Sequence, residues 1–460
     1  MKEEKQMPIV KVPAKDANII RNVDVLVIGG GPSGIGAAIS ASYENDSVLL
    51  LEKNAFLGGN ITKSYVESCN YFMKGTPFKV SGVFEKMENA YKDAYGRTGD
   101  TRPDSPFRFS SEYLKIFLDR FVSEHNVEVL FHSFVNDVIL QDDKIAAVII
   151  QTKNGPQAVT AKVVIDCSGD GDVAYASGVE FESGRKTDHL NQPGTVNFRV
   201  VGVNSAKLLA DGRDGVKEVG AKFHRDYRAG KTDLSCIRQD MPMGRLTPGG
   251  QVSYINYPCE YKINPTSIED LTKGEIACRK YIDEVVVYLK ENAYGFENVE
   301  LASIAPEIGF RDSRRIKGKY ELTIEDTLSF KEFDDCIATY PPFYDMLSPD
   351  ANMGGDGSVH GHGYKGHIYE AIKGDKAFEI PYGSLLPSKT SNLLVAGRCI
   401  SCDHVAQSAI RAISACMLTG EAAGAAAALA IKENTDVANV NIRNLQAKLR
   451  EQGVDIPKKG

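Results

Sequence analysis

The segment from Asp24 to Ala38 constrains the fold of this chain more than any other part of the sequence. Residues 25–28 are a short run of β-forming residues without alternation, which is typical of a parallel strand covered on both faces. Three glycines follow in G-x-G-x-x-G spacing and lead into a run of small residues: Gly29, Gly31 and Gly34. This spacing allows a tight turn, the close approach of a pyrophosphate and close packing of a helix on the strand. The N–H groups at the start of that helix would face the phosphates.

A second buried strand with an acidic residue at its end completes a β-α-β unit. Residues 48–51 are all aliphatic, and Glu52 follows them where a carboxylate can accept hydrogen bonds from a ribose. Residues 21–60 therefore predict a dinucleotide-binding unit. The alternative is a glycine-rich turn between strand and helix that holds no ligand.

The composition indicates an ordinary globular protein. The chain has 460 residues, 42% hydrophobic and 25% charged, which fits about two or three packed domains. The net charge of −7 and the scattered Lys and Arg residues argue against a nucleic-acid partner. No apolar stretch reaches membrane-spanning length and residues 1–20 lack a signal-peptide core, so we expect a cytoplasmic protein without a membrane partner. Nine cysteines, an odd number, favour reduced thiols over a disulfide framework.

Hydrophobic periodicity predicts the remaining elements. Strands are expected at residues 127–131, 134–141, 146–152 and 158–166, with a hairpin turn at Asn154-Gly155, and a different region of helices and loops starts at residues 198–203. Helices are expected at residues 110–124 and 267–295. Residues 340–366 are rich in Gly, Pro and His and predict a long loop near a site. Residues 392–397 predict another buried strand that enters a glycine turn, followed by a long helix of small residues at 406–432.

The late strand at residues 392–397 indicates a sheet that is completed from the far end of the chain. A nicotinamide-binding domain is usually completed locally instead. The arrangement resembles the FAD-binding fold of the glutathione-reductase and fumarate-reductase type. Several blocks are similar to the broad FAD-dependent oxidoreductase family: residues 166–174, 305–318, 379–387 and 392–401, Arg411, and residues 420–424. The resemblance covers residues 22–432.

The resemblance implies an α/β protein with a split Rossmann-like FAD-binding domain, made of a parallel sheet plus a small antiparallel sheet, and an inserted α+β substrate domain. The first part of the FAD-binding domain would span residues 21–197, and the closing strand and helix residues 378–435. The substrate or cap domain would span residues 198–377, and a helical tail residues 436–460.

The resemblance also implies which residues hold FAD. The pyrophosphate would lie against Gly29, Gly31, Pro32, Ser33 and Gly34. Glu52 would bind the adenosine ribose, and Val135 would offer its backbone to the adenine. The phosphate and ribityl side would be lined by Lys53, Gly58, Gly59 and Asn60. A second flavin-contact turn would contain Ser168, Gly169 and Asp170. The flavin ring would lie over Gly397, Arg398, Ala406, Ser408 and Ala409, where helix N–H groups would stabilise negative charge on the ring.

Two groups of residues are candidates for substrate chemistry. If residues 311–315 are helical, Arg311 and Arg315 share a face and could clamp a carboxylate. The alternative is an ion-paired surface. His362 lies in a loop with His360 and His367, where it could act as a general base. Metal binding or a solvated loop are the alternatives for these histidines, and we predict no metal site. Tyr340 would form part of an apolar wall or donate a proton.

The segment from Cys399 to His404 offers a further candidate. Cys399 and Cys402 have the C-x-x-C spacing of a redox dithiol, although such pairs in pyridine-nucleotide disulfide enzymes follow the first glycine unit. A covalent flavin link through Cys399 or His404 is a second reading of this segment. His404 is also placed to contact the flavin or the substrate.

The sequence contains no second strand-associated G-x-G-x-x-G turn, since residues 353–357 lack a preceding β run. We therefore expect a hydride to pass between the flavin and a small polar substrate (a hydroxy acid, a sugar or glycoside, or an enoate) without an NAD(P)H domain. The alternatives are an electron-transfer subunit similar to that of heterodisulfide reductases, an RNA-modifying flavoprotein, and a binding protein without turnover. The sequence leaves open the substrate, the direction of reaction, the electron acceptor or donor, and whether the chain forms a homo-oligomer.

Overall fold

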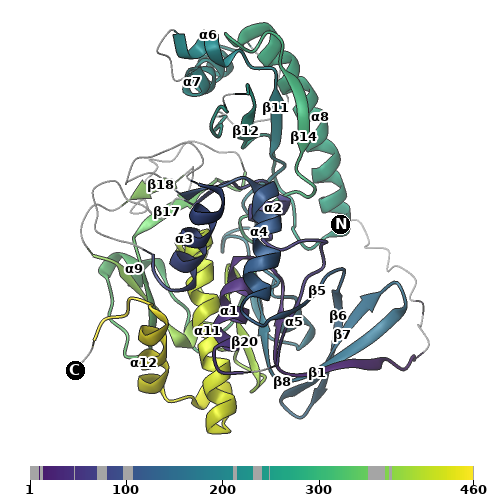
Figure 1. Cartoon of the computed structure of the whole chain (residues 1–460), viewed down its shortest axis with the longest axis vertical. Helices are drawn as coiled ribbons and strands as arrows, with labels where there is room; N and C mark the ends of the chain where they lie inside the picture. The colour runs from purple at the N-terminus through teal and green to yellow at the C-terminus, as the bar shows by residue number, and fades with distance from the viewer. Residues whose placement is uncertain are drawn as a thin grey trace.

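The main sheet of the protein is a seven-stranded, largely parallel sheet (Figure 1). The computed structural model describes residues 10, 14–45, 47–69, 80–96, 107–210, 215–231, 241–247, 249–350, 368–371 and 376–458. The strand order is β5-β2-β1-β8-β7-β6, and β20 also pairs with β8. These strands are β1 Asn18–Ile28, β2 Val48–Leu51, β5 Glu128–Leu130, β6 Phe134–Gln141, β7 Lys144–Thr152, β8 Gly155–Asp166 and β20 Leu393–Val395.

Strand β8 joins the parallel and antiparallel parts of this sheet. One edge of β8 pairs with β1 in parallel along nearly its whole length. Its other edge pairs first with β7 in antiparallel fashion and then, at Val164–Asp166, with β20 in parallel. The predicted α/β fold, with a parallel sheet, a small antiparallel sheet and a closing strand from the far end of the chain, is therefore confirmed.

Two helices of small residues pack side by side against this sheet. They are α1 (Pro32–Ser42) and α11 (Ile413–Glu433). A Cβ on Gly424 would lie 2.2 Å from the carbonyl oxygen of Ala37, so only glycine permits this approach. Helix α11 is long and apolar enough to cross a membrane by composition alone, but 94% of its most apolar window is buried inside the protein. It is therefore a core helix.

The other helices of the main body surround this pair and the sheet edges. They are α2 Asn60–Lys63, α3 Val83–Tyr95, α4 Ser111–Ser123, α5 Asp172–Ala176, α9 Ile324–Ser329, α10 Gln407–Ile410 and α12 Ile442–Gln452, with short 3-10 turns at Tyr382–Leu385 and Val437–Asn439. Paired short strands complete the body: β3 Ser68–Cys69 with β4 Phe107–Arg108, β9 Phe181–Ser183 with β15 Arg314–Ile316, β16 Cys336–Tyr340 with β19 Phe378–Pro381, and β17 Phe343–Met346 with β18 Ile368–Ala371.

A second, smaller body has its own hydrophobic core and stands at the top of Figure 1, which we call the cap. Its core runs from Val196 to Phe310, with Tyr65 added. The cap contains α6 Ser205–Ala210, α7 Gly215–Arg228 and α8 Ile268–Asn292, the strands β11 Phe198–Val201, β12 Val252–Ile255 and β14 Glu300–Ile304, and the pair β10 Gly194–Thr195 and β13 Cys259–Glu260.

The cap core ends earlier in the sequence than predicted. Residues 322–346 were expected inside the cap, but their buried side chains join the core of the main body. The reason is a non-local pairing, because β16 binds β19 just before the closing strand. The segment after Phe310 therefore returns to the main body well before the predicted boundary at residue 377.

Candidate cofactor and substrate site

A groove opens where β1, β2 and β8 end, as the glycine turn predicts. Most of the predicted cofactor residues line it, namely Gly29, Gly31, Pro32, Ser33, Glu52, Lys53, Gly59, Asn60, Val135, Ser168, Gly169, Asp170 and Arg398. Gly29 has φ +98°, and a Cβ there would lie 2.5 Å from the carbonyl oxygen of Cys167. A Cβ on Gly31 would meet only the Cα of Gly59, at 3.9 Å, and would otherwise fill the groove. The turn is therefore shaped to let a ligand approach its backbone.

Glu52 fixes the glycine turn as well as lining the groove. Its carboxylate accepts from the backbone N–H of Gly30 at 2.7 Å and from the backbone N–H of Asn54 at 2.8 Å. Its side chain is only 4% exposed. A carboxylate has about four acceptor positions, so Glu52 can still accept from a ribose hydroxyl.

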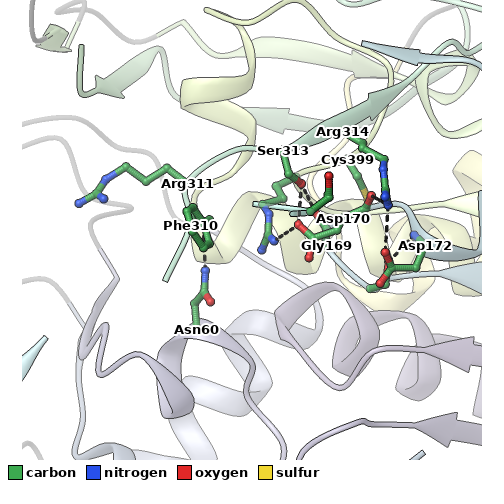
Figure 2. Close-up of polar contacts among 12 residues, drawn as sticks. Asn60, Gly169, Asp170, Asp172, Phe310, Arg311, Ser313, Arg314 and Cys399 are labelled. Atoms are coloured by element: carbon green, nitrogen blue, oxygen red, sulfur yellow. Dashed lines mark hydrogen bonds and ion pairs between the residues drawn. The ribbon is translucent and has the colours of Figure 1, made fainter. Parts of the chain in front are cut away.

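A partly buried ion pair lies at the second predicted turn. Figure 2 shows Ser313 and Asp170 facing each other, and Asp170 Oδ1 accepts from Ser313 Oγ and from Arg398 Nη2, both at 2.6 Å. Burial raises the pKa of Asp170, but the Arg398 charge and the Ser313 hydrogen bond outweigh it and hold the pKa at about 2. Arg398 therefore binds Asp170 tightly, and the Asp170 carboxylate balances most of its positive charge.

A lysine pair forms the cationic wall of the groove. Lys63 Nζ lies 2.6 Å from Glu307 Oε1, and Lys53 Nζ lies 3.6 Å from the same oxygen. Burial and the neighbouring Lys53 lower the pKa of Lys63, whereas the two lysines hold the pKa of Glu307 below its usual value despite burial. Sequence reasoning missed Lys63, although it lies on the same helical face as Asn60, three residues earlier. Two lysines and one carboxylate leave this wall positive, which suits a pyrophosphate.

Asp172 also lines the groove and was not predicted. Its carboxylate pairs with Arg314 at 3.1 Å, as Figure 2 shows. Burial and the neighbouring Asp170 and Asp166 raise the pKa of Asp172 to about 6. Arg314 additionally stacks on the ring of Tyr175 at 4.1 Å, so this arginine is committed to the main body.

Several predicted cofactor residues support the groove without lining it. They are Gly34, Gly58, Gly397, Ala406 and Ala409. Ser408 lines a second cavity, which is described below.

The predicted helix at 406–432 is in fact two helices, because Ala412 is extended at ψ 143° between α10 and α11. Helix α11 starts at Ile413, and Ile413 and Arg411 line the groove. The helix start that faces the cofactor is therefore displaced from Ala406 to Ile413.

A second cavity adjoins the groove and lies against the cap; we call it the cap cavity. It shares Asn60, Phe310, Arg311, Arg411 and Ile413 with the groove. Its other polar lining residues come from both bodies: Ser64, Ser68, Thr195, Asn197, Tyr254, Asn256, Asp345 and Ser408. The shared residues show that this cavity opens directly beside the groove.

The predicted catalytic residues are separated by the fold. Only Arg311 lines the groove and the cap cavity, and Figure 2 shows it extending away from the Asp170 cluster. Arg315 and His404 line a different cavity. Tyr340 is 1% exposed in the main core, where its hydroxyl contacts Ser414 Oγ at 3.1 Å and burial raises its pKa. His362, with His360 and His367, lies outside the described residues.

The expectation that residues 311–315 share a helical face is wrong. Residues 314–316 form β15, which pairs with β9. Side chains of a strand alternate between its two faces, so Arg314 reaches Asp172 while Arg315 turns to the opposite side. A pairing partner more than a hundred residues upstream thus overrides the local pattern.

The two cysteines of the C-x-x-C segment are buried and do not line the groove. Cys399 is 0% exposed and Cys402 is 3% exposed. Burial raises the pKa of both thiols, which disfavours the thiolate that redox exchange requires. The burial of Cys399 and Cys402 therefore indicates that both residues pack in the core.

Comparison with known proteins decides the family. A family described as FAD dependent oxidoreductase matches residues 24–449, nearly the whole chain. The chain belongs to the FAD-dependent oxidoreductase family. The cofactor is therefore FAD, and the protein is a flavoenzyme.

Individual curated proteins match only parts of this chain. It is 39% identical over 74 residues to the flavin-dependent halogenase armH3 of Armillaria mellea, covering 16% of this chain and 14% of the halogenase. It is 28% identical over 157 residues to a thiamine thiazole synthase of Methanococcus vannielii, covering 32% of this chain and 56% of the synthase. The chain thus spans less than two thirds of either relative's length.

Two solved structures align with most of this chain at low sequence identity. A geranylgeranyl bacteriochlorophyll reductase-like protein of Thermoplasma acidophilum is 14% identical at a TM-score of 0.45, over 94% of this chain and 84% of that chain. The p-nitrophenol 4-monooxygenase of Pseudomonas putida is 12% identical at a TM-score of 0.46, over 94% of this chain and 85% of that chain.

The groove of this flavoenzyme fits FAD on its own geometry. The open space in front of Gly31 admits a pyrophosphate, and Lys53 and Lys63 provide positive charge beside it. Glu52 stands at the ribose position predicted by the resemblance. Ile413 brings the N-terminus of α11 to the end of the groove that adjoins the cap cavity, where the flavin ring would lie.

Proposed function

We propose that this flavoenzyme oxidises or reduces a small polar substrate that carries a carboxylate, such as a hydroxy acid or an enoate, and that binds in the cap cavity. One observation carries the proposal. Arg311 and Arg411 line both the FAD groove and the cap cavity, so both arginines stand where substrate and flavin meet. FAD, when bound, supplies a hydride acceptor or donor at this junction.

Arg311 donates to three neutral acceptors that help to hold it in position. Its Nη1 donates to Thr195 Oγ1 at 2.8 Å and to the Pro193 carbonyl oxygen at 3.2 Å, and its Nη2 donates to Asn256 Oδ1 at 3.5 Å. These acceptors fix the orientation of the guanidinium. A fixed, planar guanidinium is suited to orient a carboxylate with two parallel hydrogen bonds.

Arg411 supplies a second positive group on the opposite element. Its Nη2 donates to the backbone oxygen of Asp345 and lies 3.3 Å from the Asp345 carboxylate. Its Nε is buried and has no hydrogen-bond partner in the described part of the chain. Arg411 is thus partly neutralised, and we assign it a supporting role beside Arg311.

The amide groups of the cavity suit the hydroxyl of a polar substrate. Asn197 donates to the backbone oxygen of Ser64 at 2.8 Å, while its Oδ1 is buried without a partner among the described residues. A buried acceptor without a partner costs about 1–3 kcal/mol. A substrate hydroxyl that donates to Asn197 Oδ1 would remove this cost.

The alternative of an electron-transfer subunit has less support. Such a subunit needs cysteine runs for iron–sulfur clusters or a redox partner. The eight cysteines in the described ranges are buried, and those ranges contain no group of three or more His, Cys, Asp or Glu residues that could hold a metal. The electron acceptor or donor, a homo-oligomeric assembly and the cytoplasmic location stay predictions.

The proposal is tested by screening matched substrate pairs without oxygen. The FAD-loaded protein is mixed anaerobically with 2-hydroxy acids and, separately, with their uncharged amides, and the flavin absorbance is followed. For the opposite direction, the pre-reduced protein receives enoates and, separately, the matching α,β-unsaturated amides. We expect the carboxylates to change the flavin absorbance and the amides to react far more slowly. Equal rates for both members of every pair would contradict a carboxylate-binding site.

A further inference from the structure

A third cavity of about 710 Å³ lies apart from the site described above. It shares no lining residue with the FAD groove or with the cap cavity. Its walls come from three segments of the main body, at residues 182–187, 315–325 and 403–405, with Asp350 at one side. The function proposed for the groove makes no use of this space.

The inner wall of the third cavity contains a buried arginine that forms no ion pair with any residue the structure describes. Arg315 is 2% exposed. Its Nε donates to the Cys402 carbonyl oxygen at 3.1 Å and its Nη2 to the Gly184 carbonyl oxygen at 2.9 Å. Among the described residues its Nη1 has no hydrogen-bond partner and no carboxylate forms an ion pair with it, and its cross-strand neighbour Glu182 interacts with it only at longer range. A buried charge without a partner costs several kcal/mol, so this guanidinium favours an anion beside it.

Several of the other charged groups of the cavity have partners within the protein. Lys317 pairs with Glu182, and Arg185 pairs with Asp188 and Asp350. The Asp403 carboxylate accepts from three backbone N–H groups, those of Ile324, Val405 and Ala406. The remaining charged lining residues, Lys186, Glu321 and Glu325, are exposed at the rim. With two rim glutamates and one rim lysine, the cavity disfavours an anion that carries two charges.

The uncharged side chains of the wall determine what the ligand can carry beside its anionic group. Ile324 and Val405 are 4% and 3% exposed and line the cavity. His404, 7% exposed, lines it beside them, with Nδ1 at 3.2 Å from Asp312 Oδ2. These side chains form an apolar and aromatic surface near Arg315, which a short aliphatic chain would cover.

We propose that the third cavity binds a short-chain monocarboxylate, with its carboxylate paired to Arg315 and its chain against Ile324 and Val405. A planar guanidinium matches a carboxylate better than it matches a spherical anion. This site is separate from the flavin site and does not depend on the function proposed for it.

The test is a calorimetric titration of the FAD-loaded full chain with pentanoate, at constant ionic strength. Pentanamide serves as the uncharged probe and inorganic phosphate as the doubly charged one. All titrations use the Arg311→Gln background, so that binding in the cap cavity does not contribute. In that background we expect saturable binding of pentanoate and binding at least about tenfold weaker for pentanamide and phosphate, because one charge-assisted pair contributes about 1.5–3 kcal/mol.

Two variants locate the binding. Thr187→Trp fills the mouth of the cavity from an exposed position, and Thr272→Trp is the matched control on the exposed face of α8. We expect Thr187→Trp and Arg315→Gln to abolish pentanoate binding and Thr272→Trp to leave it unchanged. If Arg315→Gln does not fold, Thr187→Trp decides alone. No saturable binding in the Arg311→Gln background, or binding that survives Thr187→Trp, would overturn the proposal.

Discussion

The FAD groove and the cap cavity adjoin each other but are built in different ways. The groove is formed by turns at the ends of parallel strands, and each turn brings several lining residues from one short segment, such as residues 28–33 or 167–172. The cap cavity is formed by six segments scattered along the chain, at residues 60–68, 195–197, 254–256, 309–311, 343–345 and 408–413. The residues that bind the cofactor are therefore grouped in short sequence motifs, whereas those that bind the substrate come together only through the tertiary fold.

The largest expected effect tests the local character of the groove. Gly31→Val places a side chain in the open space in front of the turn, at a backbone conformation (φ −74°, ψ −176°) that any residue adopts. The protein should fold but lose bound FAD, and the ratio of flavin to protein absorbance after purification measures this loss. Gly249→Val, also in open space, is the matched control and should keep FAD. A Gly31→Val protein that keeps full flavin content would break the comparison.

A smaller effect is expected from a residue that positions Arg311 in the cap cavity. Thr195→Val preserves shape but removes the hydroxyl that accepts from Arg311 at 2.8 Å. We expect KM for a carboxylate substrate to rise about tenfold, the worth of one hydrogen bond to a charged group, with little change in kcat or flavin content. Thr160→Val, at a half-buried site on β8 away from both cavities, is the control. A fall in FAD content with an unchanged KM would assign Thr195 to the groove instead.

The sequence predicted most of the groove because its residues follow from strand ends. Strand β6 was predicted with its exact bounds and the closing strand at 393–395 was anticipated. The break between α10 and α11 was missed, because Arg411 and Ala412 are good helix formers and the break is accompanied by a contact from Arg411 to Asp345. Arg315 was misplaced for a similar reason, since only the pairing of β15 with β9 shows the strand.

The pKa values of a carboxylate in the groove and of one in the core are shifted in opposite directions. Asp170 is held at a pKa of about 2 by Arg398, whereas burial raises the pKa of Glu421, in the middle of α11, to about 8. The fold therefore favours protonated Glu421, and the free energy of unfolding should fall as pH rises from 4.5 through about 8.

Glu421→Gln tests this assignment. The amide oxygen can still accept from the Val83 N–H, as Glu421 Oε2 does at 2.9 Å. The variant should match the parent near pH 5 and melt a few degrees higher above pH 8, at roughly 2 °C per kcal/mol for a chain of this size. Thermal melts across this pH range provide the measurement. Identical pH profiles for the two proteins would contradict a raised pKa.

The smallest expected effect concerns the C-x-x-C segment. Cys399→Ala and Cys402→Ala should leave flavin content and turnover unchanged and cost about 1 kcal/mol of stability, as a typical core substitution does. Steady-state kinetics and denaturant melts check this. Loss of turnover with retained stability in either variant would restore a redox role and move chemistry into the core of the main body.

The central claim is that Arg311, and not Arg315, serves the flavin. The most direct measurement is the anaerobic single-turnover rate of the flavin absorbance change at saturating carboxylate substrate, for Arg311→Gln and Arg315→Gln with FAD bound. We predict that Arg311→Gln slows this rate by about 100-fold, the upper worth of a charge-assisted contact, while Arg315→Gln retains the parent rate. A normal rate in Arg311→Gln together with a slowed rate in Arg315→Gln would contradict the account.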